Sequence, residues 1–240
     1  MTLLALLMVL LAAVAHAAWN LLAKSSGDKT AFTWCALAVA SVLYAPLALY
    51  MALREGMAPG GWVFALGTAL LHTLYFWSLS RGYQSGDLSV VYPIARGMGP
   101  ALVPLLAVGM LGEHMSLLAG IGVAAVVGGL YVVNLSGMAR ISWRVLMQPG
   151  TRYAFLTGLT IAIYSVWDKA GVGLVPPALY NYFPFAGATV FLAPMILKGR
   201  REKIRREWHY HRGGVLAMAM LSPLAYLLVL SALTFSPVSY

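Results

Sequence analysis

The sequence is poor in charged residues and in cysteine. Only 10% of its 240 residues are charged and only seven are acidic, whereas 61% are hydrophobic and the mean hydropathy is +0.80. The single cysteine, Cys35, excludes an intrachain disulfide, and we expect it to be a buried small apolar side chain. This composition lies far outside the range of soluble domains, so it predicts a protein that crosses a membrane several times.

The sequence motifs of common hydrolases are also absent. No Gly-x-Ser-x-Gly or His-Glu-x-x-His run occurs, so no motif supplies a nucleophile or a zinc-binding pair. His209 and His211 lie among basic residues, with no carboxylate or thiolate cluster that would complete a metal site. We therefore predict no catalytic activity, no cofactor and no metal, and an intramembrane enzyme is the least favoured alternative.

Eight apolar segments lie between charged or turn-rich breaks. Most approach the about 20 residues that a spanning helix needs, the sixth only if Asp168 and Lys169 lie at its interfacial end. The sequence thus predicts an all-α membrane protein with eight transmembrane helices. The segments are 2–22, 31–53, 62–80, 88–111, 117–135, 153–175, 179–197 and 213–235.

The basic residues are distributed unequally between the connections. Those after the second, fourth and sixth segments hold only Arg54 and Lys169, whereas the other connections hold Lys24, Lys29, Arg81, Arg140, Arg144, Arg152, Lys198, Arg200, Arg201, Lys203, Arg205, Arg206 and Arg212. This asymmetry predicts that the richer set is cytoplasmic and that the N-terminus is outside, and it accounts for the net charge of +9 without a nucleic-acid partner. We expect 198–212 to be a cytoplasmic anchoring loop, with an anionic-lipid or metal site as the alternative.

An internal repeat links the two halves of the chain. The run 16–24 aligns with 161–169, placing Trp19 over Tyr164, Asn20 over Ser165 and a lysine over a lysine. This recurrence also argues that the first segment is a spanning helix, although Ala15-His16-Ala17 resembles a signal-peptide cleavage site. Later in the chain Phe76 matches Tyr226, and Leu88-Ser89 matches Val238-Ser239.

Five helices in the first copy would make the second copy enter the membrane in the opposite orientation, as in many secondary transporters. We assign 1–137 to the first repeat, 138–152 to a connecting loop and 153–240 to the second repeat. The second repeat has only three predicted helices, so we expect a ten-helix design that is truncated here.

Arg96 is the only charge in the segment 88–111, which also contains Tyr92, Pro93, Pro100 and Pro104. A charge at bilayer depth costs about 2.5 to 3.5 kcal/mol, so it is rarely kept without a partner, a cavity or a ligand. Each proline removes a backbone donor, so this helix should be broken or bent beside a cavity. The alternative is an arginine that extends to the headgroups from near a helix end.

Helical spacing places further polar and aromatic residues on common faces, at intervals of three, four or eight residues. An arginine surrounded by aromatic rings suits a carboxylate, phosphate or phosphonate on a small apolar or aromatic body. A histidine here is otherwise a packing residue, and the rings can instead belong to an interfacial belt. The predicted substrate-binding residues are His16, Trp19, Asn20, His72, Tyr75, Tyr92, Arg96, Tyr164 and Tyr226.

The run 92–100, the following 111–116 and a glycine-rich fifth segment resemble the EamA-type transporters of the drug/metabolite transporter superfamily. The runs 16–24 and 236–240 are similar to the first and eighth helices of that family. The resemblance implies ten helices in two inverted repeats around a central cavity, and movement of small metabolites, often outward. The chain departs from it in lacking helices nine and ten, and in a charge distribution that puts the N-terminus outside.

We therefore expect a multi-pass transporter of small anionic or zwitterionic metabolites that works by alternating access. Its expected location is the plasma membrane, which is the inner membrane of a Gram-negative cell. The expected partners are a small-molecule substrate and the lipid bilayer. Small residues in 120–129 favour either close packing of the fifth helix or a homodimer. The alternative function is a truncated, non-transporting remnant or an accessory membrane subunit.

Overall fold

The computed structural model describes residues 3–138 and 147–236, and these residues form helices and no strand. The all-helical prediction is confirmed, and each of the eight predicted segments coincides with one long helix. An additional short helix, α8 (Pro177–Tyr180), precedes the seventh of these. The long helices are α1 (Leu3–Ser25), α2 (Lys29–Arg54), α3 (Gly61–Ser85), α4 (Leu88–Leu111), α5 (Leu117–Met138), α7 (Pro149–Gly171), α9 (Tyr182–Gly199) and α10 (Arg201–Leu233).

Six helical segments of the described chain are long and apolar enough to cross a membrane: α1, α2, α3, α4, the combined α8 and α9, and α10. Helix α5 contributes a shorter apolar stretch, Leu117–Gly129. Helix α7 is less apolar because it carries several Thr and Tyr residues as well as Asp168 and Lys169. The chain is therefore a multi-span membrane protein, while the number of eight spanning helices stays a prediction.

Side chains and turn residues set several helix ends. The carboxylate of Asp28 accepts a hydrogen bond from the Ala31 amide at 2.9 Å, and Asp87 accepts one from the Ser89 amide at 3.0 Å. Each aspartate thereby caps the free backbone donors of its helix, α2 or α4. At the other end of α4, Gly112 has φ of +65°, the left-handed conformation that suits glycine and stops a helix.

The fourth segment is predicted to be broken or bent, and of these two outcomes the break does not occur, because α4 continues from Leu88 to Leu111 through all three prolines. A proline at position i leaves the carbonyl of residue i−4 without its helical donor. The carbonyls freed in this way belong to Ser89, Arg96 and Pro100. Two of the three therefore lie at or one turn from Arg96, where they add backbone acceptors to the same stretch of helix.

Two predicted loops are partly helical. The basic segment 198–212 is expected to be a loop, but α10 starts at Arg201 and continues through this segment with a kink at His211 (φ −123°, ψ 20°). Helix α7 begins at Pro149, inside the predicted connection 138–152. Proline is favoured in the first turn of a helix, which explains this earlier start. Arg140, Arg144 and the Val238-Ser239 match lie outside the described residues.

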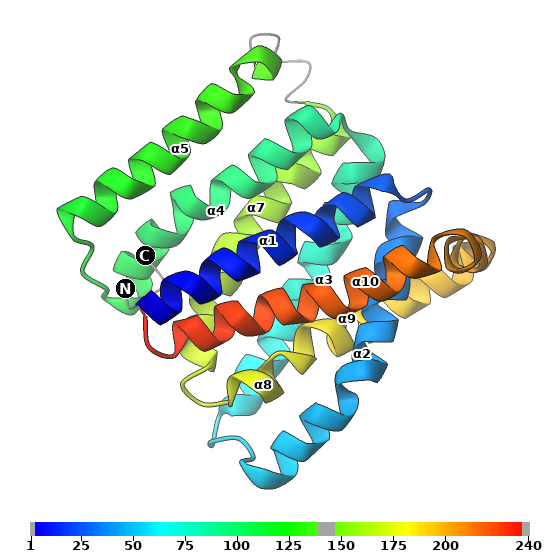
Figure 1. The fold of residues 1–240 in the computed structure, drawn as a ribbon, viewed down its shortest axis with the longest axis horizontal. Coiled ribbons are helices and arrows are strands. Elements are labelled where there is room, and N and C mark those ends of the chain that lie inside the picture. The colour runs from blue at the N-terminus through cyan, green and yellow to red at the C-terminus, as the bar shows by residue number, and fades with distance from the viewer. Residues whose placement is uncertain (1–2, 139–146, 237–240) are drawn as a thin grey trace. The chain divides into compact units, whose positions relative to one another are not determined.

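The helices form two compact units. The first contains residues 3–73 and 167–236, and the second contains the described residues between 74 and 166. In the first unit α1 lies along α10, and α2 packs against α10 and α9 (Figure 1). The second unit pairs α4 with α5. Because α3 and α7 contribute residues to both units, each unit contains parts of both predicted repeats.

Small residues allow close packing in the first unit. Ala12, Ala15 and Ala225 are buried where α1 meets α10. In α5, by contrast, a methyl group added to Gly122, Gly128 or Gly129 would meet no atom within 4 Å. The small face of α5 is thus not filled by the described part of this chain, and the homodimer stays a prediction.

Candidate functional site

The first unit contains a buried acidic cluster around Asp168. Asp168 lies in the last turn of α7 and is 1% exposed. Its Oδ1 accepts a hydrogen bond from the Tyr180 hydroxyl at 2.9 Å, and its Oδ2 accepts one from the Tyr226 hydroxyl at 2.6 Å. Tyr180 ends α8 and Tyr226 lies in α10, so three helices converge on one carboxylate.

The acidic cluster extends to His72 of α3 through a hydroxyl. Thr68 Oγ1 lies 3.4 Å from the Tyr226 hydroxyl and 3.0 Å from His72 Nδ1. The imidazole also packs edge-on against the Tyr226 ring, with centroids 4.9 Å apart. Thr68 and His72 are both buried. We call Asp168, Tyr180, Tyr226, Thr68 and His72 the aspartate cluster.

The lysine that follows Asp168 in sequence has other partners. The adjacent Lys169 donates to the carbonyls of Leu233 and Ser236, at 2.6 and 2.8 Å. In the described chain the ion pairs involve Asp28 and Glu207, and none involves Asp168. A buried carboxylate without a cation relies on its hydrogen bonds, and here neutral hydroxyls supply them.

The second unit contains an arginine surrounded by tyrosines. The Arg96 guanidinium donates to the Tyr75 hydroxyl at 3.1 Å, and its central carbon lies 6.0 Å from the centre of the Tyr75 ring. Tyr75 is buried and packs edge-on against Tyr164, with centroids 5.6 Å apart. Tyr83, Tyr92 and Tyr164 are also close enough to interact electrostatically with Arg96. We call Arg96 with these four tyrosines the arginine cluster.

Part of the arginine cluster is open. Arg96 is half-buried and Tyr92 is 38% exposed, whereas Tyr75 and Tyr83 are buried. A guanidinium presents five donors in a planar fork, and the Tyr75 and Tyr83 hydroxyls both hydrogen-bond to it. This fork geometry matches a planar or tetrahedral anion, and the tyrosine rings lie beside it.

The predicted polar residues of α1 hydrogen-bond to one another within the helix. Trp19 Nε1 donates to His16 Nδ1 at 2.9 Å, and the Asn20 amide donates to the His16 carbonyl at 2.6 Å. Trp19 and Asn20 are buried, and His16 is half-buried. Spacings of three and four residues account for both contacts, as expected for one helix face.

The nine predicted substrate-binding residues thus fall into three groups. The arginine cluster brings together Tyr75, Tyr92, Arg96 and Tyr164. His72 and Tyr226 belong to the aspartate cluster, and His16, Trp19 and Asn20 form the α1 group. Sequence analysis missed Tyr83, Thr68 and Tyr180, and although it expected Asp168 at the interfacial end of its helix, it did not predict the buried cluster around this residue. A carboxylate within an apolar segment was the available signal for Asp168.

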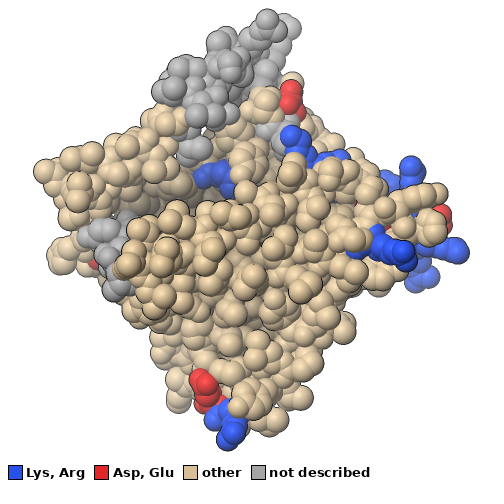
Figure 2. All heavy atoms as spheres, viewed as in Figure 1, with Lys and Arg blue, Asp and Glu red and all other residues tan. Residues whose placement is uncertain are grey.

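A network of ion pairs connects the start of α2 with the start of α10. Arg200 Nη1 donates to both carboxylate oxygens of Asp28, at 2.8 and 2.6 Å, and Lys203 Nζ lies 2.9 Å from Oδ2. The Asp28 amide donates to Glu207 Oε1 at 2.6 Å. Burial alone would raise the pKa of Asp28, but Lys203, the Ala31 amide and Arg200 together lower it below the ordinary value. Figure 2 shows basic side chains gathered where α10 begins.

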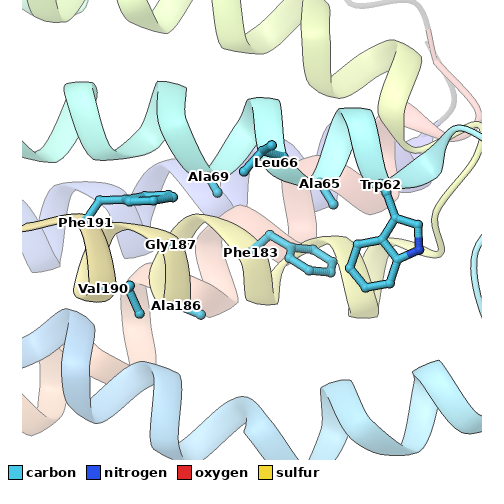
Figure 3. Close-up of a pocket in the computed structure, with 9 residues that line it drawn as sticks. All are labelled: Trp62, Ala65, Leu66, Ala69, Phe183, Ala186, Gly187, Val190 and Phe191. Atoms are coloured by element: carbon cyan, nitrogen blue, oxygen red, sulfur yellow. The ribbon is translucent and has the colours of Figure 1, made fainter.

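An apolar pocket of about 280 Å³ lies in the first unit between α3 and α9 (Figure 3). Aromatic rings of Trp62, Phe183 and Phe191 line this open pocket, and Gly187 contributes backbone. The pocket offers hydrocarbon contact but no charged side chain. It therefore fits an acyl chain or another apolar group better than an anion.

Comparison with known proteins agrees with this membrane architecture. A solved crystal structure resembles the chain with a TM-score of 0.68 at 17% identity, covering 96% of this chain and 78% of that one, so the two share a fold. The chain is 36% identical over 72 residues to "Multidrug resistance protein mmr" of Mycolicibacterium paratuberculosis (strain ATCC BAA-968 / K-10). That match covers 30% of this chain and 64% of the relative. The model of the EamA-like transporter family matches residues 3–135, more than half of the sequence, and the chain belongs to this family.

Proposed function

We propose that this membrane protein transports small anionic or zwitterionic metabolites across the plasma membrane by alternating access, with Arg96 binding the anionic group. The observation that carries the proposal is the half-buried residue Arg96, the one charged residue in the sequence of α4, whose guanidinium donates to the neutral Tyr75 hydroxyl. A guanidinium at this depth is costly, and binding an anion offsets that cost. The tyrosine rings supply an apolar surface for the rest of the substrate.

The proposed architecture has eight spanning helices in two inverted repeats, 1–137 and 153–240. It is supported by contacts between connections that the charge distribution assigns to the same side of the membrane. Asp28, between α1 and α2, binds Arg200, between α9 and α10. On the opposite side, the Ala58 amide after α2 donates to the Leu174 carbonyl after α7, at 2.9 Å. Alternation of the helices across a bilayer puts the two members of each pair on the same side, which is consistent with both contacts.

Transport by proteoliposomes tests the function. We would compare uptake of radiolabelled phenylphosphonate, O-phosphoserine and phenylalanine with uptake of rhamnose, an uncharged control. Arg96→Lys keeps the charge but loses the planar fork, so uptake of the two phosphorus compounds should fall. Arg96→Gln should reduce their binding about 30-fold or more, because losing a buried charged partner costs about 2 kcal/mol or more.

The relative's name suggests drug transport, so ethidium, a cationic drug, belongs in the same panel. Uptake of ethidium with no uptake of any anion or zwitterion would contradict the proposal. Equal uptake of phenylphosphonate by the parent and by Arg96→Gln, at equal protein content, would remove Arg96 from the binding site.

Cysteine labelling tests the orientation. The charge distribution predicts that Gly199 is cytoplasmic and Glu55 is outside, and both positions are exposed. In a Cys35→Ala background, Gly199→Cys should resist an impermeant thiol reagent added to intact cells, whereas Glu55→Cys should react. The opposite labelling pattern would reverse the proposed topology.

A further inference from the structure

Asp168 is a buried acid, so its ionised form is destabilised by the loss of contact with water. An ionised carboxyl removed from water costs several kcal/mol unless partners compensate. Its described partners are the hydroxyls of Tyr180 and Tyr226, which are neutral. Hydroxyls differ from a lysine or arginine here, because they can donate to the carboxylate and can also accept from the protonated acid. The surroundings of Asp168 therefore accommodate both protonation states.

A continuous chain of exchangeable groups leads away from Asp168. Asp168 Oδ2 lies 2.6 Å from the Tyr226 hydroxyl, which lies 3.4 Å from Thr68 Oγ1, which lies 3.0 Å from His72 Nδ1. Each hydroxyl has one proton to donate and lone pairs to accept another. When each group passes its own proton to the next, Asp168 loses one proton and His72 gains one, and both hydroxyls are regenerated. No other reactant is needed.

The His72 imidazole can form a hydrogen bond both before and after it gains the proton. His72 Nδ1 also lies 3.0 Å from the Thr68 carbonyl oxygen. A protonated Nδ1 can donate to that carbonyl, and an unprotonated Nδ1 can accept from the Thr68 hydroxyl. The site therefore offers a hydrogen bond to the ring before and after the proton arrives.

The chain of groups also runs inward along the helices. Thr68 is seven residues after the start of α3 and Tyr226 is seven residues before the end of α10, so both lie about 10 Å from those helix ends. His72 is one turn deeper, about 16 Å from the start of α3. With a hydrocarbon core of about 30 Å, a proton passing from Asp168 to His72 moves toward the middle of the bilayer.

In the described structure the titratable groups around Asp168 come from three other helices. They are His72 of α3, Tyr180 of α8 and Tyr226 of α10. Lys169, next to Asp168 on α7, is directed to the carbonyls of Leu233 and Ser236. The charge that responds to a proton here therefore resides on Asp168 and His72.

We propose that Asp168 is a proton-binding site that exchanges its proton with His72 through the hydroxyls of Tyr226 and Thr68, and that this exchange couples transport to a pH gradient. The coupling rests on the transport function proposed above, whereas the exchange itself does not. A proton suits the site better than a metal cation. The two carboxylate oxygens already accept hydroxyl protons, and the described chain has no group of three or more His, Cys, Asp or Glu that would hold a metal.

Infrared difference spectroscopy of the purified protein tests the proton site without any substrate. Titration of the parent should show the carbonyl band of a protonated carboxyl appear and disappear, and Asp168→Asn should lack that band. Tyr226→Phe should keep the band but shift its frequency, because one hydrogen bond to the carboxyl is lost. A parent spectrum with no such band, or the same band in Asp168→Asn, would overturn the proposal. Sodium ions that remove the band at fixed pH would also overturn it in favour of a cation site.

A matched pair of variants on α3 tests the exchange and the coupling. Thr68→Val removes the hydroxyl that links Tyr226 to His72, whereas Thr73→Val removes a hydroxyl that bonds only to the Ala69 carbonyl among the described contacts. We would measure accumulation of phenylphosphonate in proteoliposomes with and without an imposed pH gradient. The stimulation by the gradient should fall at least tenfold in Thr68→Val and stay unchanged in Thr73→Val.

The outcomes separate the two proposals. If the parent accumulates the anion but Thr68→Val keeps the full stimulation, the proton path is wrong and the transport function stands. If the parent moves none of the panel compounds, the transport function and the coupling both fail, and the infrared titration alone decides whether Asp168 is a proton site.

Discussion

The two units hold buried charges of opposite sign, and each surrounds its charge with tyrosine hydroxyls. In the first unit, two phenols donate to the Asp168 carboxylate. In the second unit, a phenol accepts from the Arg96 guanidinium. Because a phenol is both a donor and an acceptor, the same residue type stabilises either charge in an apolar setting. Tyrosine hydroxyls can therefore take the place of a counter-ion beside either a negative or a positive side chain.

The two clusters differ in access. Asp168 is 1% exposed, so its environment has room for protons but not for a metabolite. Arg96 is a half-buried residue and its cluster includes the partly exposed Tyr92, so part of the arginine cluster is accessible. This contrast is why we assign the substrate to the arginine cluster and the proton to the aspartate cluster. The following predictions test how each unit maintains its cluster.

The largest effect should come from a glycine contact in the second unit. A methyl group on Gly150 would clash with the backbone Cα and N of Gly86, which cannot move aside. A methyl group on Gly109, in α4 of the same unit, would meet no atom within 4 Å. Gly150→Ala should therefore lower the free energy of unfolding by about 3 kcal/mol, and Gly109→Ala by clearly less. Thermal unfolding in detergent measures both, and equal melting temperatures for the two variants would contradict this packing argument.

The helices were predictable from sequence because long apolar segments separated by polar breaks have few alternatives in a bilayer. Part of the arginine cluster was also predictable. Tyr92 and Arg96 are four residues apart on one helix, and the aromatic faces of 72–79 and 161–169 pointed to further partners. The burial of Asp168 was not predictable, because it depends on α8 and on Tyr226, which is 58 residues away in sequence. No local pattern reports such a contact.

Sequence analysis allowed a break in α4 and expected a loop at 198–212, and the structure has neither, for different reasons. Local rules treat each proline as a helix breaker, but the surrounding protein can tolerate the lost donors when the free carbonyls find other partners. In the basic segment the high charge suggested a loop, yet Arg200 and Lys203 bind Asp28 across the unit. Long-range ion pairs thus fix a helix start that composition alone does not indicate.

Removal of single hydroxyls should have an intermediate effect that is similar in the two units. Tyr75→Phe removes the acceptor for Arg96, and Tyr226→Phe removes a donor to Asp168. A hydrogen bond to a charged group contributes about 1.5 to 3 kcal/mol, so each variant should lose about 2 kcal/mol of stability. Tyr210→Phe, at an exposed position, is the control and should change little. An effect in one unit only would show that phenols do not serve both charges equally.

The smallest effect concerns the ion pairs of Asp28, which exist in the first unit and lie outside the spanning helices. Lys203, the Ala31 amide and Arg200 lower the pKa of Asp28 in the folded protein. The stabilisation is therefore present above the unfolded-state pKa of about 4 and is lost as pH falls through the lower folded-state value. Asp28→Asn keeps a capping side chain for α2 but removes the charge, so it should cost about 1 kcal/mol at neutral pH.

This cost should shrink in two conditions. At acidic pH the parent also loses the Asp28 charge, so the melting temperatures of parent and Asp28→Asn should converge. High salt should reduce the difference only in part, because Lys203 is 54% exposed and its pair is screened, whereas the Arg200 pair is mostly buried. A difference that persists unchanged at acidic pH would show that it does not come from the charge of Asp28.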